Sequence, residues 1–436
     1  MSTVLQAQPG AVSTEYDATL FDQVLVFDGR SSELIGPTQV LVRGNRIAAI
    51  GKRVEFDPSS TRVITAPGHT LMPGLIDVHV HLTFSALSMA DLVSPGLTPE
   101  IAEEAAAAEA KAMLMRGFTA VRDVGGPIFS LKAGIDRGRY TGPRVWPSGA
   151  TVSQTAGHGD FRTPQERSRR FFGQPSRAEL LGATFIADGR AEVLTAVREN
   201  LRFGASQIKL MAGGGTSSAY DPIDVTQYTF DEMRAAVEAA EDWGTYVTVH
   251  AYTPRAVQRA IDAGVRVVEH GQLLDEETLR KMAENDVWLS LQVLRASTPD
   301  MDPLRRTKRQ PIIENQPRVW SMARELGINL AWGTDFLFEP ELNHEQNAYI
   351  PLLQEWFEPA EVLKLVTHDN ARLLALSGLR SPYEGRLGVV EEGALADLLL
   401  VKGDPIADLS LIAEPSENFV VIMKDGKLVK DALNAG

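Results

Sequence analysis

Cysteine is absent from the 436-residue chain. Its absence excludes disulfide bonds, zinc–thiolate sites and a cysteine nucleophile. A site for a transition metal would therefore have to be built from histidine, aspartate, glutamate or a chemically modified lysine. Histidine is scarce as well, with eight in the whole sequence, so the position of each one can be followed.

Long apolar runs and an excess of positive charge are also lacking. No segment approaches the roughly 20 apolar residues that a membrane-spanning helix needs. The formal net charge of -14 disfavours nucleic acid and anionic membranes as partners, because the field of the chain repels both. Residues 1–8 have neither a basic region nor a continuous apolar stretch. This predicts no signal peptide and a cytoplasmic location, although a leader removed ahead of residue 1 is compatible with the same sequence.

Short strands separated by turns are predicted at both ends of the chain, and the length favours two domains. We therefore expect a small β-sandwich domain built from residues 1–72 and 387–436, with a larger α/β domain over residues 73–386 between them. The terminal strand segments are residues 23–27, 38–42, 46–50, 396–401, 419–423 and 427–429.

The middle of the chain alternates strand and helix patterns eight times. Thr98-Pro99 and Thr253-Pro254 are typical of helix starts, and Thr229 and Glu232 have capping-box spacing. No Gly-x-Gly-x-x-Gly follows the first strand, so the alternation favours a closed (β/α)8 TIM-like barrel over a doubly wound sheet. The strands are expected to begin near Leu75, Thr119, Arg144, Ser206, Thr245, Val265, Val287 and Asn329.

Two histidines lie two residues apart in an apolar run. Residues 74–81 read Gly-Leu-Ile-Asp-Val-His-Val-His, which places His79 and His81 on one face of a predicted strand. Neutral imidazoles so close together suit a divalent transition metal. Taken alone, the pair is equally compatible with two hydrogen-bonded or solvated histidines.

Four more residues of similar chemistry lie at or near the ends of later predicted strands: Lys209, His250, His270 and Asp335. The carboxyl ends of the strands are where a (β/α)8 barrel carries its chemistry. The six residues are therefore expected to meet at one end of the barrel. The other histidines outside the glycine-rich segments, His69, His344 and His368, are interpreted as structural or exposed.

Three long loops are expected to follow strands. Residues 83–97 are apolar, whereas residues 151–187 and 293–317 are rich in arginine. The two basic loops could steer an anionic substrate. The alternative is that they form a solvated surface or a contact between subunits.

Together these segments resemble the amidohydrolase superfamily. The resemblance rests on residues 74–81, Lys209, His250, His270 and Gly333-Thr-Asp335, and continues through residues 367–371, 393–397 and 403–405. Residues 153–160 and 213–222 are similar to the imidazolonepropionase-related dipeptidase branch, which includes Xaa-Pro and Xaa-Arg dipeptidases and bacterial ochratoxin-hydrolysing amidohydrolases. The match covers residues 20–430 in a consistent order, and one departure is Ala156, where relatives often carry glycine.

The resemblance implies a binuclear zinc centre, cleavage of an amide next to a free carboxylate, and a homo-oligomeric assembly. By family role, His79, His81 and Asp335 would hold one metal ion, and His250 and His270 the other. A buried, neutral lysine can react with carbon dioxide to give a carbamate whose oxygens bridge two metals, which is the role expected of Lys209. The alternative is an ordinary salt-bridged lysine.

Two cations that share a water would lower its pKa and generate hydroxide at neutral pH. Asp335 is expected to take the proton and return it to the leaving amine. His158 is expected to polarise the scissile carbonyl or stabilise the oxyanion, unless it only packs within its loop. Tyr220, Tyr252 and Arg295 are the residues expected to bind the substrate carboxylate.

The leading hypothesis is an amidase or dipeptidase acting on N-acyl amino acids or dipeptides with a free carboxylate. An ochratoxin-like aryl amide of phenylalanine fits it, because the apolar residues 83–97 could hold an aromatic group. A second hypothesis is a cyclic amide or imine hydrolase, or a deaminase, on the same scaffold. A third, a non-catalytic binding protein, predicts the loss of metal positions, and none is missing.

Overall fold

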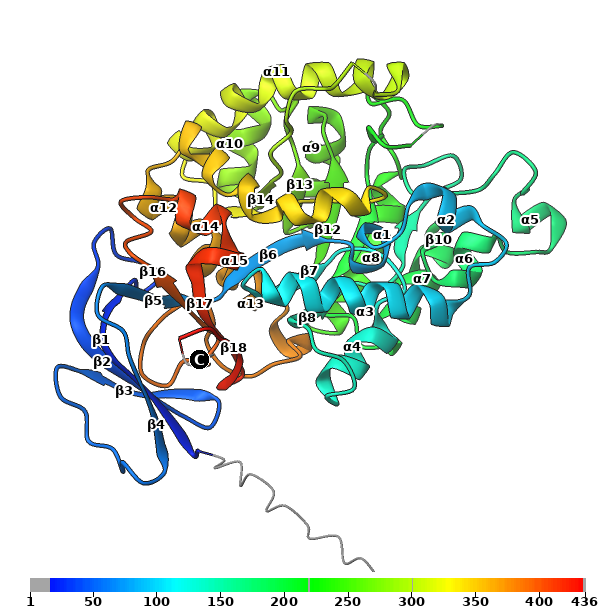
Figure 1. The fold of residues 1–436 in the computed structure, drawn as a ribbon. Coiled ribbons are helices and arrows are strands. Elements are labelled where there is room, and N and C mark those ends of the chain that lie inside the picture. The colour runs from blue at the N-terminus through cyan, green and yellow to red at the C-terminus, as the bar shows by residue number, and fades with distance from the viewer. Residues whose placement is uncertain (1–15, 219, 300, 434–436) are drawn as a thin grey trace, which may run out of the picture.

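The computed structural model describes residues 16–218, 220–299 and 301–433, so the predicted absence of a signal peptide concerns residues outside the described part (Figure 1).

Strands from both ends of the chain form one eight-stranded mixed sheet, in the order β18-β17-β16-β5-β1-β2-β3, with β4 paired to β1. All six predicted terminal segments overlap these strands, although residues 27, 396 and 397 lie just outside them, and β4 and β5 were not predicted individually. The strands are β1 (Ala18–Val26), β2 (Ile35–Arg43), β3 (Arg46–Gly51), β4 (Thr61–Thr65), β5 (His69–Pro73), β16 (Leu398–Lys402), β17 (Phe419–Lys424) and β18 (Lys427–Asp431).

Parallel strands dominate the middle of the chain, which confirms the predicted α/β class. They form a three-stranded sheet, β6-β7-β8, and a seven-stranded sheet, β10-β9-β11-β12-β13-β14-β15. All eight predicted strands are present, and the short strands β9 and β10 were not predicted. The strands are β6 (Leu75–Val80), β7 (Phe118–Asp123), β8 (Arg144–Pro147), β9 (Thr151–Ser153), β10 (Thr184–Ile186), β11 (Ile208–Met211), β12 (Val247–Ala251), β13 (Val267–His270), β14 (Trp288–Leu291) and β15 (Leu330–Trp332).

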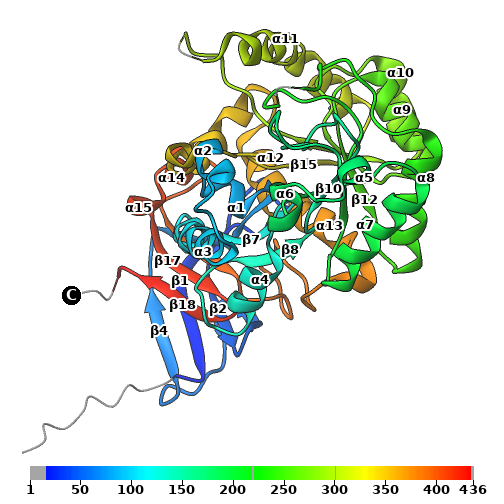
Figure 2. The same cartoon turned by 90° about the vertical axis from the view of Figure 1, so that its right-hand side faces the viewer.

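Helices cover the outside of the parallel strands, and Figure 2 shows α7 to α10 following one another along one side. The longer ones are α3 (Pro99–Met115), α4 (Phe129–Asp136), α7 (Arg190–Arg202), α8 (Phe230–Asp242), α9 (Pro254–Ala263), α10 (Glu276–Glu284) and α11 (Pro303–Glu325). The shorter ones are α1 (Leu82–Ser85), α2 (Met89–Val93), α5 (Arg169–Phe172), α6 (Arg177–Leu181), α12 (Pro359–Lys364), α13 (Asn370–Ala375), α14 (Ser410–Ala413) and α15 (Pro415–Asn418). Helical turns of other types are η1 (Pro340–Tyr349), η2 (Pro351–Glu355), η3 (Leu365–Asp369) and η4 (Gly378–Arg380).

The predicted helix starts are correct in position. The Thr98 side chain caps α3, and Thr229 and Glu232 form the expected capping box of α8. Pro254 begins α9, but the hydroxyl of Thr253 accepts no capping hydrogen bond. Within the described residues, no helix is long and apolar enough to cross a membrane.

All three of the expected long loops contain regular structure. Residues 83–97 include α2 and most of α1, residues 151–187 include β9, β10, α5 and α6, and the expected loop over residues 293–317 ends when α11 begins at Pro303. Asp302 caps this helix and a proline occupies its first turn, but Pro311 and Pro317 lie inside it. Internal prolines remove backbone donors and normally end a helix, which explains why the sequence favoured a loop here.

The last parallel strand meets the first one. The backbone N–H of Asp335 donates to the carbonyl of His79 at 2.8 Å. The Asn370 amide joins the same two strands, because its Nδ2 donates to the carbonyls of Ile76 at 2.6 Å and Trp332 at 2.8 Å. A side chain at Gly333 would collide with the His79 backbone, since its Cβ would lie 2.4 Å from that nitrogen. The seam therefore brings the residues after β15 against the end of β6.

A buried ion pair connects the parallel strands to the mixed sheet. Arg144, at the start of β8, donates to both carboxylate oxygens of Asp397, at 2.8 and 3.2 Å. The same Nη2 that makes the longer of these two bonds also donates to a carboxylate oxygen of Asp425, at 2.6 Å. Arg144 and Asp397 are buried, so removing Asp397 leaves a buried guanidinium that is paired, among the described residues, with the partly exposed Asp425 alone.

We expect Asp397→Asn to destabilise the protein by about 3 kcal/mol, because a buried guanidinium loses its main partner. The control is Glu199→Gln, which removes the ion pair between Glu199 and Arg202. Both side chains of this pair are exposed, Glu199 by 43% and Arg202 by 61%. An exposed pair of this kind contributes less than about 1 kcal/mol. Urea unfolding followed by tryptophan fluorescence measures both changes, and equal losses would contradict a structural role for the buried pair.

Candidate metal centre and substrate cavity

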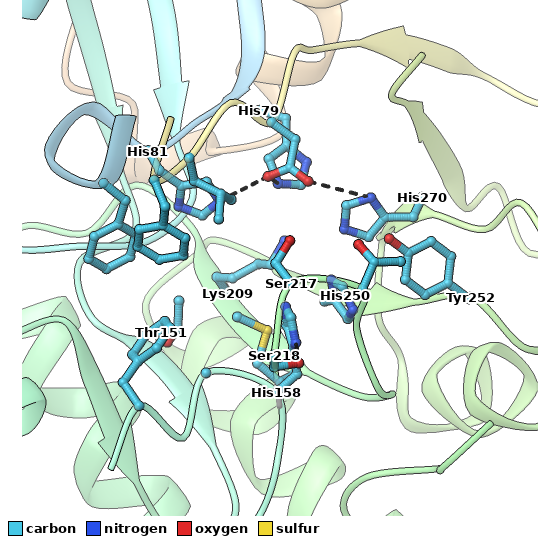
Figure 3. A pocket seen from close by; sticks show the side chains of 18 residues that line it. His79, His81, Thr151, His158, Lys209, Ser217, Ser218, His250, Tyr252 and His270 are labelled. Carbon is cyan, nitrogen blue, oxygen red and sulfur yellow. Dashed lines mark hydrogen bonds and ion pairs between the residues drawn. The ribbon is translucent and has the colours of Figure 1, made fainter. Parts of the chain in front are cut away.

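The predicted metal residues converge on one cavity (Figure 3). His79 lies in β6 and His81 directly after it, and one carboxylate oxygen of Asp335 lies 3.2 Å from His79 Nε2 and 3.3 Å from His81 Nε2. The other oxygen of Asp335 lies 4.0 Å from His270 Nδ1. Nitrogen and oxygen atoms of His79, His270 and Asp335 all lie within 4.8 Å of one another, a spacing that a single cation can span.

The outer nitrogens of the first two histidines are already hydrogen-bonded. His79 Nδ1 lies 2.8 Å from a carboxylate oxygen of Glu269, and His81 Nδ1 lies 3.0 Å from the carbonyl of Gly125. A ring that donates its Nδ1–H to such an acceptor leaves the lone pair of Nε2 free for a metal. Both Nε2 atoms face Asp335, so the pair is oriented for ligation.

The second pair of histidines completes the other side of the cavity. His250 lies in β12 and His270 ends β13, with their ring centroids 4.5 Å apart. His250 Nε2 lies 3.1 Å from the carbonyl of Gly214, which leaves Nδ1 as its free nitrogen. His270 and Asp335 both have positive φ angles, 77° and 55°, which side chains other than glycine rarely adopt. Strained backbone of this kind is typical of functional sites.

Lys209 extends from β11 into the same cavity. It is 1% exposed and forms no ion pair within the described part of the chain. Burial lowers the pKa of its amine to about 8, against the attraction of Glu269 and Asp335. A larger neutral fraction than that of an ordinary lysine is what carbamate formation needs. The salt-bridged alternative therefore has no partner among the described residues.

The charge states of the cluster suit a cation. Burial lowers the pKa of His81, His250 and His270, so these rings are neutral. Burial opposes protonation of His79 as well, but the carboxylates of Asp335 and Glu269 outweigh it and raise its pKa. Neutral nitrogen ligands beside ionised carboxylates form a donor set that fits zinc or a similar divalent ion.

Glu269 is a functional residue that sequence reasoning missed. It is fully buried and accepts hydrogen bonds from Arg122 at 2.5 Å and Thr248 at 2.5 Å, besides holding His79. Arg122 in turn donates to the hydroxyl of Tyr246 at 3.2 Å. The available signal was a charged residue within an apolar strand, directly before His270. Such outer partners fix the orientation of metal ligands.

His158 lies at the cavity, stacked on His250 with ring centroids 4.0 Å apart. Its Nδ1 lies 3.1 Å from a carboxylate oxygen of Asp221 and 2.9 Å from the hydroxyl of Ser218. The same oxygen of Asp221 accepts from the backbone N–H of Gly215 at 2.7 Å. His158 is thus oriented by a buried acid that the sequence analysis did not identify.

Lys308, from helix α11, holds the glycine-rich segment that carries Asp221. Its buried ammonium donates to the carbonyl oxygens of Gly215, Ser218 and Asp221, at 3.1, 2.8 and 2.8 Å. These three acceptors match the three donors of an ammonium. The role of Lys308 depends on contacts between segments far apart in the sequence.

The predicted carboxylate-binding residues have different positions. Tyr252 is buried at the cavity and stacks on His270, with ring centroids 5.0 Å apart. Arg295 borders an adjoining hollow, where it pairs with Glu345. Tyr220 is 51% exposed and is absent from the described lining of both hollows. The structure therefore brings Tyr252, but not Tyr220, to the metal cluster.

Aromatic side chains form the opposite end of the cavity. Phe84, from the predicted apolar segment, lies 5.7 Å from Phe161 and 5.5 Å from Phe338 between ring centroids. Phe84 also stacks beside His81, with centroids 5.7 Å apart. The cavity thus has an apolar end next to one metal ligand and a polar end next to Tyr252.

Three histidines lie elsewhere, as expected. His69 belongs to β5, His344 to η1, and His368 in η3 interacts with Asp369 at 2.9 Å. In the basic segment 151–187, Arg162, Arg169 and Arg170 pair with acids, whereas Arg177 donates to the carbonyl of Leu97. Part of the positive charge of this segment is therefore compensated, which weakens its steering of an anionic substrate.

Comparison with known proteins agrees with this geometry. Residues 70–429 match the amidohydrolase family. The ochratoxinase of Aspergillus niger is 29% identical over 452 residues, which cover 99% of this chain and 91% of the relative. A prolidase crystallised with N-methylphosphonate-L-proline aligns with a TM-score of 0.86 and 32% identity, over 95% of this chain and 100% of the other. A Xaa-Pro dipeptidase with bound methionine gives a TM-score of 0.80 and 29% identity, over 95% and 100%.

The family match covers most of the chain, including every residue of the metal cluster, and the similar structures extend over both the parallel strands and the mixed sheet. The residue types gathered in the cavity and the similarity of the whole chain to known proteins both indicate an amidohydrolase. The resemblance predicted from the motifs is therefore confirmed. The chain belongs to the amidohydrolase family and is a hydrolytic enzyme.

Proposed function

We propose that this hydrolase is a binuclear-metal amidohydrolase that cleaves an amide next to a free carboxylate. Its substrates are dipeptides or N-acyl amino acids, including ochratoxin-like aryl-acyl-phenylalanine amides. The observation that carries the proposal is the convergence on one cavity of four histidines, one carboxylate and a buried lysine that has no ion pair among the described residues. The similarity to an ochratoxinase and to prolidases supports amide hydrolysis as the reaction class.

In this proposal His79, His81 and Asp335 would hold one zinc or similar ion, and His250 and His270 would hold the other. Lys209, once carboxylated on its amine, would serve as a ligand to both. When bound, such cations act as Lewis acids and lower the pKa of water towards neutrality. Glu269 and the carbonyls of Gly125 and Gly214 keep the histidine rings in the orientation that this requires.

The protein groups that handle the proton and the developing charge are Asp335 and His158. The pKa of Asp335 is held well below its usual range, because its neighbours His79 and His81 outweigh the effect of burial, so its carboxylate is ionised. We propose that this carboxylate takes a proton from the attacking water and passes it to the leaving amine. His158, oriented by Asp221, donates from its other nitrogen to the scissile carbonyl oxygen.

The two ends of the cavity suit the two ends of an acyl amino acid. Phe84, Phe161 and Phe338 offer an apolar surface for an aromatic acyl group. Tyr252 offers a hydroxyl beside His270, on the side where the amino-acid part would lie. A substrate placed in this way has its amide over the metal cluster.

We also propose that the two parallel sheets close into one (β/α)8 barrel over residues 73–386. The backbone and Asn370 contacts between β6 and β15 support closure at one seam, and β8 and β9, separated by three residues, pair with β7 and β11 at the other. The mixed sheet would then fold as a β-sandwich formed by residues 1–72 and 387–436, of which residues 1–15 and 434–436 lie outside the described part. A homo-oligomeric assembly and a cytoplasmic location stay predictions.

A substrate panel tests the proposed function. We expect the zinc-loaded protein to hydrolyse some members of a series of Xaa-Pro, Xaa-Arg, Xaa-Phe and aryl-acyl-Phe amides, and to carry about two metal ions per chain by elemental analysis. Chelation should abolish the activity. Cyclic amides and amino-substituted heterocycles serve as the comparison. Hydrolysis of these compounds alone would support the cyclic amidase or deaminase instead, and full activity in chelator would refute the metal mechanism.

Lys209→Ala should lower activity by more than the roughly 10- to 100-fold that loss of an outer ligand partner costs, because a bridging ligand is removed. Metal content should fall as well, and short carboxylic acids should restore part of the activity by replacing the carbamate. Lys111→Ala, at an exposed position of α3, is the control for removing a lysine. Near-native turnover and metal content in Lys209→Ala would show that the lysine is not carboxylated.

Asp335→Asn should retain the fold and much of the metal but lose the base. A general base contributes roughly 10²–10⁴-fold to the rate, so kcat should fall by at least this factor while KM changes less. Steady-state kinetics on protein with confirmed metal occupancy measures the effect. A loss smaller than about tenfold would mean that another group moves the proton, and His158 would be tested next.

A further inference from the structure

Three arginines border the hollow that adjoins the metal cavity: Arg295, Arg305 and Arg309. The two hollows share several lining residues, including Tyr252, His270 and Asp335, so a ligand can extend from one into the other. An arginine in this position could bind an anionic group of the substrate. The question is which of the three is free to do so.

Two of the arginines already have carboxylate partners. Arg295 pairs with Glu345, and its guanidinium lies 4.1 Å from the ring centroid of Tyr349. Arg305 pairs with Glu339. A substrate carboxylate would have to displace an internal carboxylate from either of them, which offsets the gain in binding.

Arg309 has no such partner. Within the described residues it forms no ion pair, and its one recorded hydrogen bond runs from a terminal nitrogen to the carbonyl of Arg295, at 3.1 Å. Its Nε is buried without an acceptor. Burial and the nearby charge of Arg305 lower the pKa of the guanidinium and outweigh the opposing effect of Glu339, in keeping with the absence of a paired carboxylate among the described residues.

Lys308, the residue before Arg309 on helix α11, is a buried cation whose hydrogen-bond donors are all satisfied. The ammonium of Lys308 is surrounded by three carbonyl acceptors. Arg309, one position further along, borders the hollow with most of its five donors unused. A cation left without compensation at a cavity reduces stability, and proteins tolerate such a cost at functional sites.

We propose that Arg309, rather than Arg295, binds the carboxylate of the substrate. The inference rests on the proposed function, and it assigns a specificity-determining residue to it. In an acyl amino acid one carbon separates the amide nitrogen from the carboxylate, so the receptor must lie close to the metal cluster. Tyr252 meets this condition through its stack on His270, and Arg309 and Tyr252 border the same hollow. The planar guanidinium can donate two parallel hydrogen bonds to a carboxylate.

Binding of L-phenylalanine and of L-phenylalaninamide to the metal-loaded protein, measured by calorimetry, tests the inference. The two probes have the same side chain and differ in the carboxylate. We expect the wild type to prefer the acid by about ten- to a hundredfold, and Arg309→Gln to abolish this preference. Arg309→Lys should retain part of it, because it keeps the charge but not the planar fork. The melting temperature of Arg309→Gln should not fall, since the lost charge was uncompensated.

Arg295→Gln and Arg305→Gln are matched controls on the same hollow, and both should keep the wild-type preference. For an acyl-phenylalanine substrate, Arg309→Gln should raise KM with little change in kcat. An unchanged preference in Arg309→Gln, loss of preference in Arg295→Gln, or a wild type that binds acid and amide equally would each overturn the inference. Intact preference for the acid in a protein that hydrolyses none of the panel would refute the proposed function instead.

Discussion

The site depends on one buried carboxylate. Glu269 lies between Arg122 and His79, with no exposed surface on either Glu269 or Arg122. A buried pair of this kind contributes little net stability, because the desolvation of both charges offsets their attraction. The pair instead fixes the orientation of a neighbouring ring, because Glu269 holds His79. Arg122 Nε also donates to the carbonyl oxygen of Val78 at 2.6 Å, which links the same carboxylate to strand β6. The geometry of the metal cluster is thereby built into the interior of the protein.

The convergence of the candidate metal ligands could be predicted from the sequence because their spacing follows from strand geometry. His79 lies near the end of β6 and His81 directly follows that strand, and His250, His270 and Asp335 fall at or just after the ends of apolar segments that were recognisable as strands. In a parallel α/β arrangement these ends meet, so their convergence needs no knowledge of loop structure. The alternation of strands and helices predicted the α/β class for the same reason.

The residues that support the cluster could not be predicted in this way. Asp221 and Lys308 act through segments that are 63 and 93 residues away from the groups they hold, and only the folded chain shows these pairings. Arg309 could not be separated from Arg295, because the distinction depends on which acids pair with which arginines. The sequence predicted a loop over the first part of α11, which carries Lys308 and Arg309, because two prolines lie inside this helix.

The position of Lys308 limits how the substrate specificity of the enzyme can change by mutation. Helix α11 borders the hollow through Arg305 and Arg309, and the same helix fixes the glycine-rich segment that orients His158. A substitution that shifts α11 to admit a different substrate therefore also moves His158, the residue proposed to bind the scissile carbonyl. Residues linked by shared contacts show non-additive effects. Variants of this helix should be strongly epistatic with variants of residues 213–222, so a new specificity is reached more readily by changing both segments together than by accumulating single steps.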